Sequence, residues 1–185
     1  MPQPYLGCKV EAKVGGWVMD EQERTERQTP IPAQQTPPLL FFGNYDHSID
    51  AKGRIIIPNA YRKALGDSFT LTVESDDVGI AIYPDEAFYA MVKELHALNA
   101  LKPSVKRKRD HVAKFSYPGT QADNQGRVLL PAKLRQYALG DVRDVEISGA
   151  LDHIRIVPSE VGQAEDDYYR EHREQINEEI GSLGD

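Results

Sequence analysis

The sequence predicts a β-rich α+β fold built from two tandem, pseudo-symmetric repeats. The stretch DAKGRIIIP at residues 50–58 returns seventy-three residues later as DNQGRVLLP at residues 123–131. In each copy an arginine follows four residues after the proline, so both copies read D-x-x-G-R-x-x-x-P-x-x-x-R. Two short apolar runs, typical of a β-hairpin, follow each copy. A unit of roughly 44 residues buries too little surface to be stable alone, so we expect the two repeats to share one core.

Residues 1–40 precede the first repeat and are expected to form a disordered extension. The segment TPIPAQQTPPLL holds four prolines between Thr29 and Pro38. Proline interrupts helices and central strands and favours extended conformations. The simplest interpretation is an unstructured leader or a misassigned start codon.

The first repeat is expected over residues 43–87. Its RIIIP run is short, β-branched and apolar, which is typical of a buried strand. Pro58 suits the first turn of a helix and Gly66 suits its end. The expected elements are a strand at 44–49, a turn at 50–53, a strand at 54–58, a helix from 58 to 66 and a hairpin of 69–73 with 79–83.

The second repeat, expected over residues 116–160, follows the same order. Its offset from the first repeat grows from 73 to 74 near Gly140, where one residue is gained. The expected elements are a turn at 123–126, a strand at 127–131, a helix at 131–139 and a hairpin of 144–149 with 153–157.

Helices are expected between and after the repeats. Residues 88–115 form the linker helices, because apolar residues recur with helical spacing up to Leu101 and a second helical segment, 103–115, follows. Residues 161–185 form an acidic C-terminal helix or tail with an apolar stripe. Packing of this tail against the linker helices is one of the alternatives for its role.

Charge is distributed unevenly along the chain. The net charge is −7, yet residues 41–140 carry 14 basic and 11 acidic residues, a net charge of +3. Residues 141–185 carry 4 basic and 13 acidic residues, a net charge of −9. The basic middle can therefore meet a polyanion, while the acidic end repels it or lies far from it.

Composition favours a cytoplasmic protein that is not an enzyme. No apolar run approaches the roughly 20 residues of a membrane helix, and the N-terminus lacks the basic start and apolar core of a secretory signal. Cys8 is the only cysteine, so no disulfide within the chain is possible, and five scattered histidines give no zinc spacing. No catalytic constellation or phosphate loop stands out, so we expect no catalytic residue, metal or cofactor.

The repeated turn allows a structural and a binding interpretation. Gly53 and Gly126 stand where a tight turn enters a strand, and glycine tolerates the positive φ needed there. Asp50 and Asp123 are natural turn initiators. Each aspartate can also bond the arginine four residues later across the turn, which explains the aspartates without any ligand.

A binding role explains the basic residues better. Lys52 and Arg54 place two cations at a loop tip beside backbone N–H groups, and such groups contact phosphate, while arginine also reads guanine bidentately. The candidate DNA-contacting residues are Lys52, Gly53, Arg54, Arg62, Arg127 and Arg135. The basic run KRKRD at 106–110 is less suitable, because four consecutive helical residues spread over about 300°. We interpret that run as a solvated surface or an intersubunit salt-bridge site.

The stretch FFGNYDHSIDAKGRIIIPNAYRKAL, residues 41–65, resembles the start of the MraZ family. These are bacterial transcriptional regulators, typically encoded at the head of the division and cell-wall gene cluster. The stretch DNQGRVLLPAKLRQYALG, residues 123–140, resembles that family's second repeat. The resemblance covers about residues 41–160. It implies two SpoVT-AbrB-type units per chain in a swapped-hairpin, double-split β-barrel, and ring-shaped oligomers on repeated DNA boxes upstream of the cluster.

Carried over to this chain, the family's D-x-K-G-R loop falls on Asp50, Lys52, Gly53 and Arg54. We expect Arg54 to contact DNA. The second copy departs from the pattern, because Gln125 stands where the first copy has lysine. This favours a role for the second copy in the barrel and the subunit interface.

The sequence thus predicts a cytoplasmic, nucleoid-associated, sequence-specific repressor that binds double-stranded promoter DNA as a ring of identical subunits, with no membrane contact. Several weak, salt-sensitive loop contacts would add through effective concentration. The alternative is an antitoxin-type protein-interaction module with the same barrel, whose acidic tail binds a basic partner. The tail beyond residue 161 either opposes DNA approach or packs on the helices of 85–115.

Overall fold

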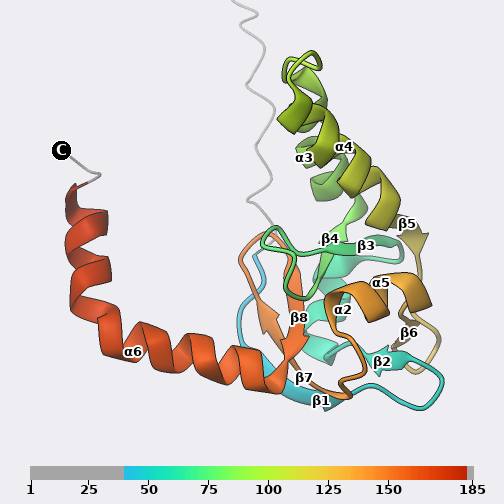
Figure 1. Ribbon diagram of the computed structural model, residues 1–185. Coiled ribbons are helices and arrows are strands. Elements are labelled where there is room, and N and C mark those ends of the chain that lie inside the picture. Colours follow the sequence, from blue (N-terminus) through green and yellow to red (C-terminus); the bar gives the residue numbers. More distant parts are fainter. Residues whose placement is uncertain (1–39, 183–185) are drawn as a thin grey trace, which may run out of the picture. The chain divides into compact units, whose positions relative to one another are not determined.

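The computed structural model describes residues 40–182, so the expected N-terminal extension lies almost entirely outside the described residues. The described part is a mixed α+β structure with mostly antiparallel sheet, as predicted (Figure 1). Its elements are β1 (Asn44–Ser48), β2 (Arg54–Ile56), α2 (Asn59–Leu65), β3 (Phe69–Val73), β4 (Ile80–Pro84), α3 (Asp85–Ala97), α4 (Pro103–Phe115), β5 (Tyr117–Thr120), β6 (Arg127–Leu129), α5 (Ala132–Ala138), β7 (Asp144–Gly149), β8 (Ile154–Pro158) and α6 (Ser159–Ser182).

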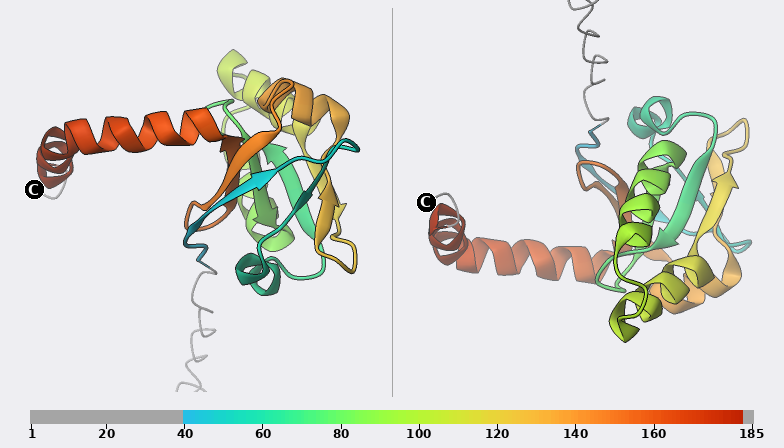
Figure 2. Two further views of the ribbon diagram at one scale, coloured as in Figure 1. Left: turned by 90° about the horizontal axis from the view of Figure 1, so that it is seen from below. Right: turned by 90° about the horizontal axis from the view of Figure 1, so that it is seen from above.

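The strands form a six-stranded sheet in the order β1-β7-β8-β4-β3-β5 and a separate two-stranded ribbon of β2 and β6. Both predicted hairpins are present, β3 with β4 and β7 with β8. The repeats exchange their first strands, because β1 pairs with β7 of the second repeat and β5 pairs with β3 of the first. Figure 2 shows the sheet and the ribbon from below and from above.

Two local features differ from the expected elements. β5 falls where no strand is expected, since its sequence YPGT contains proline and glycine. It pairs only with β3 and lies at a sheet edge, the position at which a strand tolerates proline. Helix α3 ends at Ala97 although the apolar spacing continues to Leu101, because Leu98 is extended and the Asn99 side chain accepts the Leu101 N–H at 2.9 Å.

The core is shared by the two repeats, as predicted. Its fully buried side chains come from β2, α2, β3 and β4 of the first repeat and from β6, α5, β7 and β8 of the second. They include Ile55, Tyr61, Leu71, Ile82, Val128, Leu134, Ile147 and Ile154. Neither repeat can bury its apolar face without the other, so the chain folds around one core.

Helix α6 does not pack as expected. It contacts β7 and β8, and Gly162 in its first turn is buried, but from Gln163 onward nearly every residue is exposed. The prediction that the acidic tail packs on its own linker helices is wrong, because β4 and β8 run antiparallel. Helices α3 and α6 continue these two strands and therefore leave the sheet at opposite ends (Figure 1). Within residues 40–182, none of the helices combines the length and apolar character that a bilayer crossing requires.

A buried polar cluster joins the repeats beside the central strands. The Nε2 atom of His153 lies 3.0 Å from Oε2 of Glu74, and its Nδ1 atom lies 2.7 Å from Oδ1 of Asp152. The imidazole also stacks on the Tyr83 ring, with centroids 4.5 Å apart. Burial raises the pKa of Glu74, but the hydrogen bonds from His153 and from the Ser75 N–H outweigh it and lower that pKa to about 2. Burial lowers the pKa of His153, but the hydrogen bonds to Glu74 and Asp152 outweigh it and raise that pKa above 6.5.

This cluster should make stability depend on pH. The raised pKa of His153 stabilises the folded state fully at pH values below 6.5, its pKa in the unfolded chain. This stabilisation is lost as the pH rises through the pKa of His153 in the folded state. The lowered pKa of Glu74 stabilises the folded state fully at pH values above 4.5, the ordinary pKa of this carboxyl. That stabilisation is lost as the pH falls toward about 2, the pKa in the folded state. Urea unfolding should therefore show the largest difference in free energy between wild type and His153→Gln at pH 4.5–6.5, declining toward pH 9. Glu74→Gln should show the same trend, and a difference that stays constant with pH would contradict this role.

Candidate nucleic-acid interface

The two copies of the motif meet in the β2–β6 ribbon. The strands pair antiparallel, with Ile55 opposite Val128. Hydrogen bonds extend the ladder at both ends, from the Ile57 N–H to the Gly126 carbonyl at 2.9 Å and from the Leu130 N–H to the Gly53 carbonyl at 3.0 Å. Since each turn precedes its strand, the two turns lie at opposite ends of a ribbon about 14 Å long.

The first turn is organised by Asp50. Its Oδ1 atom accepts the N–H groups of Lys52 and Arg54 at 2.8 and 2.9 Å, and its Oδ2 atom accepts Nε–H of Arg54 at 2.8 Å. The Gly53 N–H donates to the Asp50 carbonyl at 2.9 Å. The Arg54 backbone N–H, followed by its guanidinium, holds the pKa of Asp50 at about 2. The expected aspartate–arginine bond is confirmed, and Asp50 also accepts the N–H groups of Lys52 and Arg54, so these two groups are not free to bind phosphate.

The second turn repeats this hydrogen-bonding pattern. Asp123 accepts the N–H groups of Gln125 and Arg127 at 2.9 and 3.0 Å, and Nε–H of Arg127 at 2.7 Å. The backbone N–H of Arg127, followed by its guanidinium, lowers the pKa of Asp123. The two turns therefore share a backbone design and differ in their surrounding side chains.

The last arginine of each motif lies at the turn of the other copy. Arg135 of α5 packs over Gly53, and Arg62 of α2 packs over Gly126 while its Nε–H donates to the Ile57 carbonyl at 2.8 Å. Both glycines have positive φ, +77° and +76°, and a Cβ at either position would overlap the arginine above it. The spacing of the motif thus places the last arginine of each repeat over the turn glycine of the other. This contact cannot be predicted from the sequence of either repeat alone.

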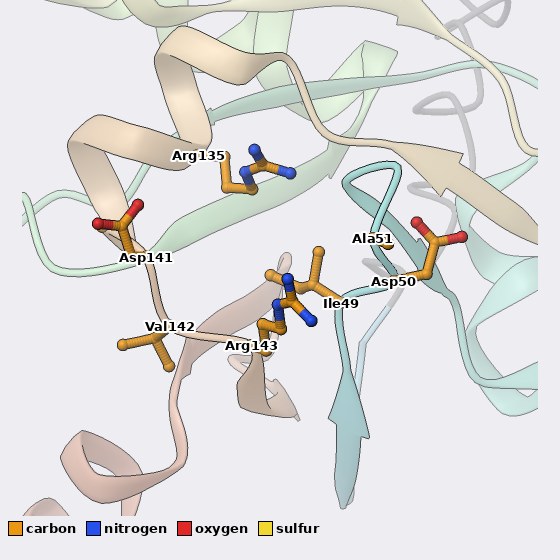
Figure 3. Close-up of a pocket in the computed structure, with 8 residues that line it drawn as sticks. Ile49, Asp50, Ala51, Arg135, Asp141, Val142 and Arg143 are labelled. Carbon is orange, nitrogen blue, oxygen red and sulfur yellow. The ribbon is translucent and has the colours of Figure 1, made fainter.

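A cavity of about 340 Å³ lies beside the first turn. Figure 3 shows Arg135 and Arg143 reaching into it from the second repeat, opposite Asp50 and Ala51. The related cavity beside the second turn is smaller, about 200 Å³, and Phe69 occupies the place that corresponds to Arg143. Arg143 lies outside the repeated motif, so motif-based reasoning misses it, although its pairing with phenylalanine is visible once the repeats are aligned.

The two turns consequently differ in positive charge. Four cationic residues surround the first turn, whereas two surround the second, where glutamine and phenylalanine replace the others. Those at the first turn are Lys52, Arg54, Arg135 and Arg143, and those at the second are Arg62 and Arg127. Among the sequence-predicted residues, the structure places Arg135 with the first-turn group and Arg62 with the second.

The outer face of the ribbon is partly apolar. Ile56 and Leu129 are exposed, at 45% and 61%, while Ile55 and Val128 point into the core. On this face each exposed apolar residue stands opposite a turn arginine, because Arg54 pairs with Leu129 and Ile56 with Arg127. The face can therefore offer cations and apolar groups together to one extended anionic surface.

Two residues of the basic run at 106–110 make contacts within the α3–α4 segment. Arg109 donates to the carbonyl oxygens of Leu95, His96 and Leu98 and so closes the end of α3. Lys106 pairs with Asp110 at 2.6 Å on the same helix. These residues do not form one basic face, in line with their helical spacing. In the described part of the chain, no group of three or more His, Cys, Asp or Glu side chains is placed to hold a metal ion.

Comparisons with known proteins bear on the same part of the chain. Residues 40–110 match the family described as "MraZ protein, putative antitoxin-like". Similar proteins named transcriptional regulator MraZ include one from Lachnoclostridium phytofermentans, 38% identical over 63% of this chain and 80% of that protein. Another, from Syntrophomonas wolfei, is 33% identical over 78% of this chain and 99% of that protein.

The reciprocal arginine–glycine contact can be tested by stability. Gly126→Ala should destabilise the protein more than Gly140→Ala, because both glycines have positive φ but only the first would collide with a guanidinium. The backbone cost common to both is about 1–2 kcal/mol. Adding Arg62→Ala to Gly126→Ala should remove the collision, so the double variant should lose less than the sum of the single losses in urea unfolding. Equal losses for the two glycine variants would contradict the contact.

Proposed function

The chain belongs to the MraZ family of transcriptional regulators, and we propose that it acts by binding double-stranded DNA through the first turn and the exposed face of the β2–β6 ribbon. The observation that carries this proposal is the group of four cations around the first turn, drawn from both repeats. Phosphate contacts by lysine and arginine supply most of the affinity of such proteins and position them on the duplex.

The geometry of the ribbon supports contact with base edges as well as phosphates. A two-stranded ribbon fits the major groove, in which apolar side chains can meet the thymine methyl group and arginine can pair with guanine. Arg54 uses its Nε and Nη2 atoms to hold Asp50. Among the described residues its Nη1 atom has no hydrogen-bond partner, so that edge is available to DNA.

The proposal also covers the barrel, the regulated genes and the assembly. The strand exchange supports a swapped-hairpin, double-split barrel of two SpoVT-AbrB-type repeats at 43–87 and 116–160, with 88–115 as linker and 161–185 as tail. The regulator acts as a sequence-specific repressor of the division and cell-wall gene cluster, in the cytoplasm and on the nucleoid. It binds repeated promoter boxes as a ring, because several turns on one assembly multiply weak contacts through effective concentration.

An antitoxin-type interaction module is the second candidate. The family description contains the term antitoxin-like, and the exposed acidic α6 could bind a basic protein. Co-purification of a basic partner by a chain that does not shift promoter DNA would favour this candidate. Salt-dependent binding to the DNA upstream of its own gene would favour the regulator.

Arg54→Ala should weaken specific DNA binding by about 1–3 kcal/mol if this arginine reads a base. Asp50→Asn is the matched control, because it weakens the ion pair of the turn and leaves the guanidinium in place. Arg127→Ala should cost less than Arg54→Ala at the same salt concentration, since its turn carries fewer cations. Gel shifts with the upstream DNA give the affinities, and light scattering verifies that the assembly is intact. An equal loss for Asp50→Asn and Arg54→Ala would assign Arg54 to the turn alone.

Exchanging the one motif residue that differs between the turns tests their asymmetry directly. Lys52→Gln gives the first turn the residue of the second and should weaken binding and lower the slope of log affinity against log salt by about 1. Gln125→Lys makes the opposite exchange and should strengthen binding. Salt titrations of both variants measure these slopes. A larger effect from position 125 than from position 52 would place the dominant contact at the second turn.

A further inference from the structure

We propose that α6 of one copy docks in the apolar groove between α3 and α4 of a second copy and so joins subunits head to tail. The inference rests on the proposed oligomer and deepens it, because it names the two surfaces that form the contact. Both surfaces belong to the described chain, and the DNA-facing turns take no part in either of them.

The groove lies between the two linker helices. A cavity of about 310 Å³ is lined mainly by apolar side chains, with Val92 and Leu95 on α3 and Val112 and Ala113 on α4. Phe88 forms its buried floor. The loop between α3 and α4 adds exposed apolar surface, because its Leu98 and Leu101 side chains are 54% and 90% exposed.

Helix α6 offers an unpartnered apolar stripe of suitable form. Tyr168, His172, Ile176 and Ile180 recur at every fourth position and follow a ridge that turns by about 120° around the helix between its ends. Tyr168 and Ile180 are 59% and 61% exposed, and the Tyr168 ring stacks on His172 with centroids 4.1 Å apart. The 24 residues of α6 give a helical path of about 36 Å, which bends part-way along its length (Figure 1).

The charges of the two surfaces are complementary. Helix α6 holds eight acidic and two basic residues, a net charge of −6. Helix α4 holds five basic and one acidic residue, a net charge of +4. Arg109 lines the groove and the exposed Lys108 lies beside Val112 around the helix, whereas Arg107 and Lys114 face the opposite side of α4. The net charges of the two helices therefore attract, and Arg109 and Lys108 are the cations of α4 on the groove side.

The occupant is a second copy because the chain cannot dock its own α6. Helix α3 follows β4 and helix α6 follows β8, and these strands are antiparallel neighbours. The two helices therefore leave opposite ends of the sheet, and the first turn of α6 is tied to β7 and β8 (Figure 1). Different surfaces on the two partners make a heterologous contact, which closes into a ring or continues as a filament.

Single substitutions with matched controls test each surface. Ile176→Asp places a carboxylate in the apolar stripe, whereas Asn177→Asp places the same group on the neighbouring exposed position of α6. Ala113→Glu narrows the groove, whereas Ala90→Glu alters an exposed alanine of α3 outside the groove. Multi-angle light scattering of full chains, without DNA, should show assemblies for wild type and both controls, and monomers for Ile176→Asp and Ala113→Glu. Circular dichroism and urea unfolding should verify that both variants are folded.

Mixing the two variants tests the head-to-tail geometry. The Ile176→Asp chain keeps an intact groove and the Ala113→Glu chain keeps an intact α6, so one contact can form between them. The mixture should therefore contain heterodimers, while each variant alone remains monomeric. An interface in which both partners use the same patch would give no such rescue.

Several results would overturn the proposal. These are a monomeric wild type, wild-type assemblies from folded Ile176→Asp or Ala113→Glu chains, loss of assembly in the controls, or a mixture without heterodimers. Failure of the proposed function is distinguishable, because the masses are measured without DNA. Assemblies that behave as expected but do not shift the upstream DNA would refute DNA binding and leave the docking in place.

Discussion

The reciprocal packing of arginine on glycine is the contact on which this fold depends. Arg62 lies over the turn of the second repeat and Arg135 over the turn of the first. A Cβ beneath either guanidinium would force that side chain to shift, and each turn has a positive φ, so glycine suits both conditions. The same crossing aligns the β2–β6 ladder and brings α2 and α5 onto one core. Neither repeat can complete its own turn, strand pairing or core.

This crossing also makes the candidate interface composite. The first turn receives Arg135 and Arg143 from the second repeat and supplies Lys52 and Arg54 itself. The expectation that the second copy serves mainly in the barrel and subunit interface is therefore incomplete as a description of this geometry. Substitutions at Arg135 will alter both the packing over Gly53 and the charge of the cavity. A change in DNA affinity caused by such a substitution must therefore be compared with the change in the free energy of unfolding.

Local sequence patterns predict most of the elements but not their partners. The alternation and spacing of apolar residues predicted both hairpins, and the Asp-x-x-Gly-Arg spacing predicted the bond between Asp50 and Arg54. The exchange of β1 and β5 does not follow from periodicity, because strand pairing depends on tertiary contacts, and only the family resemblance implies a swapped arrangement. β5 itself carries Pro118, which a central strand would exclude and an edge strand accepts.

The candidate site was predicted in part for similar physical reasons. Residues inside the motif could be found by spacing alone, whereas Arg143 lies outside it and is brought to the first turn by the pairing of β1 with β7, where the Ile49 N–H donates to its carbonyl at 2.8 Å. Asp50 is a turn initiator by sequence, and its carboxylate accepts the N–H groups of Lys52 and Arg54. Once the aspartate accepts the N–H groups, the side-chain cations alone remain to attract phosphate.

The acidity of the chain must be reconciled with the proposed binding of DNA. Its net charge is −7, and α6 alone contributes −6. Exposed charges act over about a Debye length, roughly 10 Å at 0.1 M salt, so a free acidic helix near the turns would repel the duplex. Docking of α6 beside the α4 helix of a neighbour, whose net charge is +4, would offset part of that acidity. Assembly would then repeat the basic turns along the DNA and would also reduce the repulsion between the duplex and the acidic helix.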